Sequence, residues 1–297
     1  MSTTKSAPML AAFWMLGAVA SFSLMAIGGR QVVGDLNTFE LMFLRSLIGL
    51  TLVLAYGMVL GRMADVRTRR LPLHAVRNVF HFTAQNLWFY AVAFIPLAQL
   101  FAIEFTTPIW IALLAPLLLG EAMTKWRIIA AVLGFAGILI IAQPGTSELS
   151  LGHLTAALST IGFAGSIMMT KALSRTEKTF TILFWLTVTQ AIYGAAIVLW
   201  DGEMTLPQGP DTVWVIVVGV GGLTAHICLT QALGLAPASV VAPMDFARLP
   251  LIAVVGWLVY SEEIGLAVIL GAVLILSANV LNLRAETRRP TRSERPA

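Results

Sequence analysis

The sequence predicts an all-α integral membrane protein whose ten transmembrane helices form two inverted five-helix repeats. Three observations support this fold class. Of the 297 residues, 58% are hydrophobic and only 11% are charged, and the mean hydropathy is +0.85, whereas soluble domains carry about 25% charged residues. Long apolar runs follow one another with short loops between them. The chain also matches itself at a spacing of 141 residues.

Ten apolar segments are long enough to span a bilayer, which requires about 20 mostly apolar residues per helix. Their ranges are 10–29, 38–60, 73–94, 97–119, 125–143, 151–172, 179–200, 212–233, 238–259 and 264–283. A membrane β-barrel is excluded because its strands alternate polar and apolar residues over about ten positions. We expect residues 1–9 to form the N-terminal segment, 10–143 the first repeat, 151–283 the second repeat and 284–297 a basic tail.

The distribution of charge between these segments predicts how the chain is oriented. The basic residues gather in every second loop and in the C-terminal tail: Arg62, Arg67, Arg69 and Arg70; Lys125 and Arg127; Lys171, Arg175 and Lys178; and Arg284, Arg288, Arg289, Arg292 and Arg295. The alternate loops are bare or mostly acidic, with Arg30 as an exception that Asp35 offsets. The positive-inside rule therefore places both termini in the cytoplasm of a bacterial inner membrane.

The apolar segments include a signal-like N-terminal stretch and the single cysteine of the chain. Lys5, an apolar stretch and Ala18-Val19-Ala20 together resemble a cleavable secretory signal. We expect this segment to be retained, because the repeat makes it the counterpart of an internal helix. Cys228 is the only cysteine and lies inside the eighth segment, which excludes an intrachain disulfide and a cysteine metal site.

The internal repeat carries polar and structural residues, not only the aliphatic matches expected by chance between apolar segments. Without a gap, Arg30 aligns with Lys171, Thr83-Ala84 with Thr224-Ala225, Pro96 with Pro237, Glu104-Phe105 with Asp245-Phe246 and Glu121 with Glu262. Each unit holds five spans, an odd number, so the second unit enters the membrane from the opposite side. Inverted repeats of this kind are typical of secondary transporters that bind their substrate near the midplane.

The stretch LAQLFAIEFTTPIWIALLAPLLLGE, which begins at Leu97, and the matching segment that ends in LVYSEE resemble the drug/metabolite transporter superfamily, in particular its EamA-type ten-helix branch. The likeness covers residues 10–283 and extends to YddG-type amino-acid exporters. It implies that the third, fourth, eighth and ninth helices line a central cavity. It also implies that the fifth and tenth helices lie near a dimer-like pseudo-interface.

Two carboxylates lie inside apolar helices, where an ionised group is costly. Glu104 is about seven residues, or about 10 Å, from the start of its helix, and Asp245 occupies the inverted position. We expect both to face a wet cavity and to bind a substrate ammonium or carry a coupling proton. The structural alternative is neutralisation within the protein, for which Arg248, three residues after Asp245, is a ready partner.

Further polar and aromatic residues share these levels. His81 and His226 are candidates for a proton relay or for an interhelical hydrogen bond, and Gln85 is the repeat counterpart of His226. Trp88 and Phe105 are candidate cavity rings, although lipid-facing aromatic residues give the same composition. We expect Arg77 to extend to the cytoplasmic surface. Arg45 is expected either to hold a substrate carboxylate or to pair with Glu40.

Prolines interrupt both predicted cavity helices, because proline removes a backbone hydrogen bond and bends a helix. They are Pro108 and Pro116 in the fourth helix and Pro243 and Pro250 in the ninth. We interpret them as gating kinks or as fixed bends that shape the cavity. Glu121 and Glu262, at helix ends, are expected to anchor a cap or a loop.

No catalytic motif is present: the sequence lacks GxxxxGK[ST], GxSG and HExxH. We therefore expect no enzyme activity, no cofactor, no metal site and no nucleic-acid partner. The partners expected are the lipid bilayer, a small-molecule substrate such as an amino acid, and protons as a candidate coupling ion. The sequence thus favours an alternating-access exporter of apolar or aromatic amino acids. The alternatives are an importer of a larger metabolite, such as a vitamin or S-adenosylmethionine, and a channel.

Overall fold

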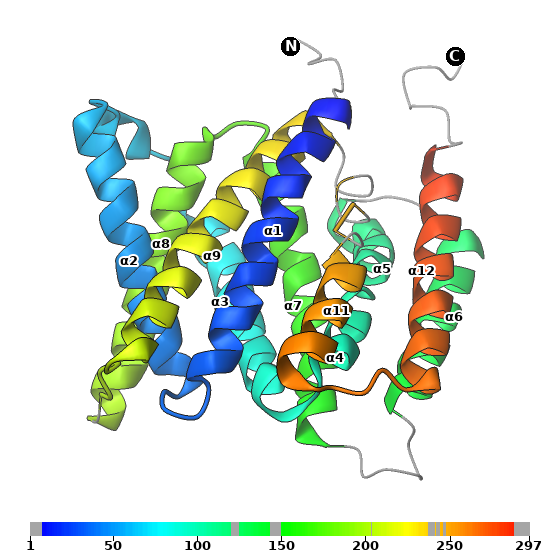
Figure 1. The fold of residues 1–297 in the computed structure, drawn as a ribbon. Coiled ribbons are helices and arrows are strands. Elements are labelled where there is room, and N and C mark those ends of the chain that lie inside the picture. Colours follow the sequence, from blue (N-terminus) through cyan, green and yellow to red (C-terminus); the bar gives the residue numbers. More distant parts are fainter. Residues whose placement is uncertain are drawn as a thin grey trace, which may run out of the picture.

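The computed structural model describes residues 8–119, 125–142, 150–202, 204–236, 241, 244–245 and 248–287, and contains no strand in these ranges (Figure 1). The first repeat comprises α1 (Pro8–Val32), α2 (Thr38–Val59), the short 3₁₀ helix η1 (Met63–Val66), α3 (Leu71–Phe94), α4 (Leu97–Glu104), α5 (Thr107–Leu119) and α6 (Lys125–Ala142). The second comprises α7 (Leu151–Leu173), α8 (Thr179–Asp201), α9 (Pro210–Leu235), α11 (Arg248–Tyr260) and α12 (Leu266–Thr287). The predicted all-α fold is confirmed.

The helices run side by side along one direction, and α1 and α12 place both termini at the same end of the bundle (Figure 1). We call this the terminal end and its counterpart the opposite end. Five of the described helices, α1, α2, α7, α8 and α9, are long and apolar enough to cross a membrane. Large apolar side chains such as Phe13, Trp200 and Trp257 are exposed on the outside of the bundle, as expected for a surface that lipid covers.

The two repeats interlock instead of forming separate domains. The most extensive packing joins α1 to α9 and, in the mirrored arrangement, α7 to α3; α2 packs on α8 and α6 on α12. Each of these four pairs takes one helix from each repeat. The middle of the bundle is therefore an interface between repeats, where α3 and α9 face the N-terminal helix of the other unit.

Helix α3 is the most polar of the long helices, and its polar side chains point inward. Its buried residues include His74, Arg77, Asn78, His81 and Gln85. In contact with lipid these groups would have no hydrogen-bond partners. Their burial indicates that α3 lines a polar interior, and this interior contains the candidate site.

Candidate functional site: a cavity between the repeats

A cavity of about 870 Å³, measured to its open mouth, lies at the repeat interface between α1, α3, the α4–α5 segment, α7 and α9. On α3 its lining residues are Arg77, His81, Gln85 and Trp88, whose spacings of three and four residues place them on one helix face. Arg77 and Trp88 are eleven residues apart, so the cavity extends about 16 Å along α3 at 1.5 Å per residue. This length suits an elongated small molecule.

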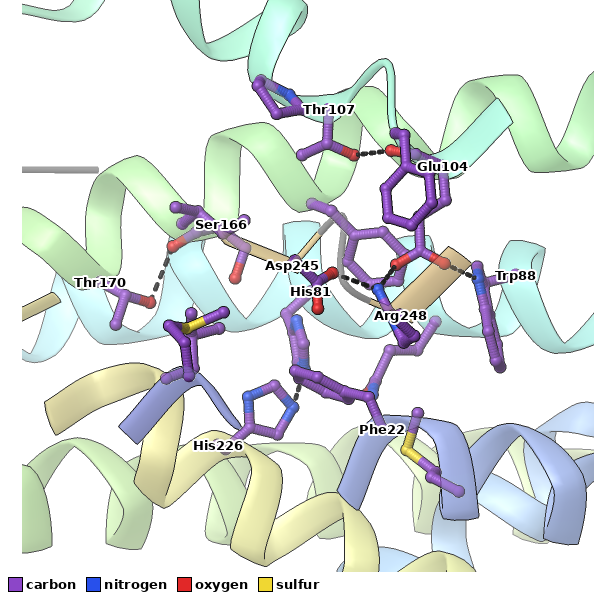
Figure 2. Close-up of a pocket in the computed structure, with 18 of the residues that line it drawn as sticks. Phe22, His81, Trp88, Glu104, Thr107, Ser166, Thr170, His226, Asp245 and Arg248 are labelled. Atoms are coloured by element: carbon purple, nitrogen blue, oxygen red, sulfur yellow. Dashed lines mark hydrogen bonds and ion pairs between the residues drawn. The ribbon is translucent and has the colours of Figure 1, made fainter. Parts of the chain in front are cut away.

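All eight residues that the sequence singled out as cavity candidates line this one space. They are His81, Gln85, Trp88, Glu104, Phe105, His226, Asp245 and Arg248. Figure 2 shows Glu104 and Trp88 at one side of the cavity and Ser166 and Thr170 at the other, with His226 and Phe22 on the facing wall. Their roles in binding remain predictions.

A buried cluster of two carboxylates and one arginine lies at the Glu104 side of the cavity (Figure 2). Arg248 Nη2 donates to Glu104 Oε1 over 2.6 Å and to Asp245 Oδ2, and its side chain is only 3% exposed. Trp88 Nε1 donates to Glu104 Oε2 over 2.7 Å. The expected pair of Asp245 with Arg248 is present, and the same arginine also neutralises Glu104. Among the described residues, Asp245 Oδ1 and Arg248 Nε have no hydrogen-bond partner.

Glu104 is held at a break in the fourth span. The sequence predicted one bent helix over 97–119; instead α4 ends at Glu104 and α5 begins at Thr107. Pro108 lies in the first turn of α5, where proline is tolerated, and it cannot donate to the Glu104 carbonyl four residues earlier. The Thr107 hydroxyl donates to that carbonyl over 2.6 Å. The break therefore leaves the backbone satisfied and directs Glu104 into the cavity.

Two of the other prolines lie within described helices. Pro116 is inside α5, and Pro250 is the third residue of α11. Pro243 lies outside the described residues. The gating role of all four prolines remains a prediction.

His81 and His226 contact each other across the interface between α3 and α9. Their Nε2 atoms are 3.0 Å apart, and the Nδ1 atom of each ring is buried without a partner among the described residues. The sequence allowed two roles for these histidines, a proton relay or an interhelical hydrogen bond, and the hydrogen bond is present. Phe22 packs edge-on against His226, with ring centroids 5.5 Å apart.

The expectation for Arg77 was wrong. Arg77 does not reach the surface: it is 2% exposed, lines the cavity, and donates to Thr170 Oγ1 over 2.9 Å and to Asn78 Oδ1 over 2.7 Å. The packing of α3 against α7, which the sequence does not reveal, keeps it inside. For Arg45, the alternative of a pair with Glu40 is not present: Glu40 accepts the backbone N–H groups of Asn37 and Thr205. Its other alternative, a substrate carboxylate, remains a prediction.

A group of hydrogen bonds made by Arg30 and Glu262 lies at the opposite end of the bundle, beyond the cavity. Arg30 donates to the last carbonyls of α3, those of Val92 and Ile95, and to Glu262 Oε1 over 2.7 Å. Glu262 Oε2 in turn accepts the first N–H of α4, that of Leu97, over 2.9 Å. Glu262 is thus the loop anchor that the sequence predicted. Its counterpart Glu121 lies outside the described residues.

The repeat reproduces this contact at the terminal end. Lys171 is the counterpart of Arg30, and its Nζ donates to the carbonyls of Leu233 and Ala236 over 2.6 and 2.9 Å. These two residues lie 141 positions after Val92 and Ile95. The sequence repeat is therefore a structural repeat with the same hydrogen bonds at both ends of the bundle. Among the residues that the structure describes, no cluster of histidine, cysteine, aspartate or glutamate is suited to a metal ion.

The EamA-like transporter family matches residues 9–143 and 150–284. The chain belongs to this family. Each matched stretch contains one five-helix unit, and the two meet at the cavity. The predicted family and the architecture of two inverted repeats are confirmed.

This EamA-like protein is similar to several curated transporters. It is 28% identical to a riboflavin transporter of Vibrio cholerae over 293 residues, and this match covers 97% of each chain. An S-adenosylmethionine uptake transporter of Rickettsia felis is 23% identical and covers 94% of each chain. The pseudopaline exporter CntI of Pseudomonas aeruginosa is 27% identical over 89% of this chain and 93% of that protein. Together with the family match, these relatives show that the chain is a transporter.

A solved crystal structure has the same fold, with a TM-score of 0.67 and 18% identity over 94% of this chain and 98% of the other. At this identity the likeness supports the fold alone.

Proposed function

We propose that this transporter carries riboflavin, or a similar flat heteroaromatic metabolite with a polar substituent, into the cell by alternating access. This is the importer alternative of the sequence analysis, and it is better supported than the amino-acid export that the sequence favoured. The relatives that were compared move a vitamin, a nucleoside-linked sulfonium compound and pseudopaline, and none of their names is that of an amino-acid exporter.

The observation that carries the proposal is a cavity wall that combines four aromatic rings with hydrogen-bonding groups at both ends. Four rings surround the cavity: Phe22, Trp88, Phe105 and Phe163. Ring systems of this kind stack on flat heterocycles. Hydrogen-bonding groups lie at both ends of the wall, Glu104 at one and Arg77 at the other.

The cluster at the Glu104 side also offers hydrogen bonds to such a heterocycle. Among the described residues, Asp245 Oδ1 and Arg248 Nε have no hydrogen-bond partner. One can accept from the polar groups of the substrate and the other can donate to them.

The proposal includes the orientation predicted from the basic loops. Both termini face the cytoplasm of a bacterial inner membrane, so the terminal end is the cytoplasmic end. The contact between Arg30 and Glu262 then lies at the outer side. Protons remain a candidate coupling ion.

Growth of a riboflavin-auxotrophic bacterium that lacks its own uptake system tests this function. Expression of the chain should restore growth at riboflavin concentrations too low for passive entry. Trp88→Ala removes a cavity ring and should abolish the rescue, whereas Trp200→Ala removes an exposed ring and should leave it intact. Failure to rescue, together with raised tolerance to toxic phenylalanine analogues, would support amino-acid export instead.

A further inference from the structure

Four hydrogen-bonding side chains without an acidic neighbour lie at the Arg77 side of the cavity and immediately behind it. They are Arg45 from α2, Arg77 and His81 from α3, and His226 from α9, and each is at most 6% exposed. We call this group the acid-free end. In the described ranges, no carboxylate forms an ion pair with Arg45 or Arg77. The carboxylates of the cavity are instead held by Arg248.

The contacts of these groups leave donors unused. Arg77 directs Nε to Thr170 and Nη1 to Asn78, and Nη2 forms no described hydrogen bond. Arg45 contacts only the sulfur of Met42, with its Nη1 3.6 Å from Sδ, which is a weak acceptor. A buried guanidinium without a counter-charge is unfavourable, and most unfavourable in a membrane interior. The acid-free end can therefore donate hydrogen bonds to an acceptor on a bound molecule.

Comparison of the two repeats shows that this end is an addition to the shared framework. At the spacing of 141 residues, Arg45 corresponds to Leu186, Arg77 to Val218, His81 to Gly222 and His226 to Gln85. The framework contacts of Arg30 and Lys171 are the same in both halves. Three of the four positions thus have nonpolar counterparts, so the helices can pack without these groups.

Gly222 shows that the chain makes room for one of them. A Cβ atom at this position would overlap with Arg45 Nη2. The guanidinium lies in the space that this Cβ atom would fill, so a larger residue at 222 requires the Arg45 side chain to move. Arg45 also lines a smaller chamber of about 260 Å³, which shares His226 with the main cavity. Its charge therefore lies behind the histidine pair and adds to the positive potential of the acid-free end.

We infer that the acid-free end is a subsite for an oxygen acceptor on the substrate, with Arg77 as the direct donor; this rests on the proposed function of the same cavity. A guanidinium N–H group donates a strong, charge-assisted hydrogen bond to a carbonyl or carboxylate oxygen. The imide edge of a flavin ring carries a carbonyl oxygen on each side of its N–H group, and one of these oxygens accepts from Arg77. The flat ring then lies against the aromatic residues of the cavity wall.

Equilibrium binding of radiolabelled riboflavin to the purified full-length protein tests the subsite. Arg77→Gln should weaken binding at least tenfold, and Arg77→Lys, which keeps the charge but loses the guanidinium, should fall between this variant and the wild type. Arg69→Gln makes the same chemical change at an exposed position and should bind like the wild type. Gly222→Ala should weaken binding by displacing Arg45, although it removes no polar group.

A second ligand separates a binding role from a structural one. Riboflavin methylated at the imide nitrogen should bind the wild type at least tenfold more weakly than riboflavin, because the methyl group blocks the imide edge. The Arg77→Gln protein should bind both ligands equally, since the interacting partner is already absent. Equal losses on methylation in the wild type and in the variant would overturn the inference, as would wild-type affinity for riboflavin in Arg77→Gln.

A wild-type protein that binds no riboflavin would refute the proposed function, and the subsite would then be tested with L-phenylalanine, whose carboxylate also offers oxygen acceptors. A tenfold loss of phenylalanine binding in Arg77→Gln would support the subsite, and unchanged binding would overturn it. Binding of neither ligand by the wild type would overturn both proposals.

Discussion

Replacing Arg248 by methionine should destabilise the protein more than removing either of the carboxylates that it contacts. Methionine keeps the length and apolar bulk of the side chain between the rings of Phe22 and Phe101. The charge is lost, so Glu104 and Asp245 remain buried without a cation. Buried charges that lose their partner are strongly destabilising.

The geometry sets the size of the effect. At the 2.6 Å separation of Arg248 and Glu104, Coulomb attraction at an effective dielectric constant of about 20 is about 6 kcal/mol. Desolvation offsets part of this attraction, and removal of one partner from a buried pair costs about 3–5 kcal/mol. Glu104→Gln should cost only about 1–3 kcal/mol, since one charged hydrogen bond is lost while the pair of Arg248 with Asp245 remains.

Unfolding in mixed micelles with increasing fractions of a denaturing detergent measures these differences. The predicted order of stability is wild type, then Glu104→Gln, then Arg248→Met. The double variant Glu104→Gln/Arg248→Met should be more stable than Arg248→Met alone, because a single buried acid is left without an acidic neighbour. An Arg248→Met protein as stable as the wild type would refute the assignment of the cluster as a mutually dependent unit.

Three further changes test other parts of the structure. Thr107→Ala should lower stability by about 1 kcal/mol, because it leaves the Glu104 carbonyl unsatisfied; Thr107→Ser should not, and equal unfolding midpoints for the two variants would contradict this. Asp65 accepts hydrogen bonds from Lys178, which hold the pKa of its carboxyl below the usual value. Its stabilising contact is therefore complete above pH of about 4 and is lost as the pH falls through the lowered pKa. Hydrogen exchange of residues 61–70, corrected for intrinsic rates, should rise in acid and show no such rise in Asp65→Asn. Arg30→Met should open the opposite end of the bundle and increase the labelling of a cysteine introduced there; unchanged labelling would show that this contact does not close the cavity.

The membrane fold and the composition of the cavity could be predicted because both depend on patterns within the sequence. Polar groups such as Glu104 and Asp245 are conspicuous in apolar helices, since the bilayer tolerates them only when they face inward. The spacing of 141 residues also predicted that Arg30 and Lys171 are equivalent, and they make the same backbone contacts in the two halves.

Other features depended on three-dimensional packing that no sequence pattern records. Arg77 lies only six residues into α3, where an arginine usually extends to the interface, and only the packing of α3 against α7 keeps it inside. The pair of His81 and His226 requires the exact rotation of two helices from different repeats. The break after Glu104 was hidden because the apolar run continues through it, although Thr107-Pro108 is a signal for a helix start.

The measurement that tests the central claim most directly is uptake of radiolabelled riboflavin into proteoliposomes that contain the purified protein. The uptake should be saturable, and unlabelled riboflavin inside the vesicles should accelerate it. Trp88→Ala should lose both properties, whereas Trp200→Ala should keep them. Absence of saturable riboflavin uptake in vesicles that exchange phenylalanine through the same protein would contradict the proposed function.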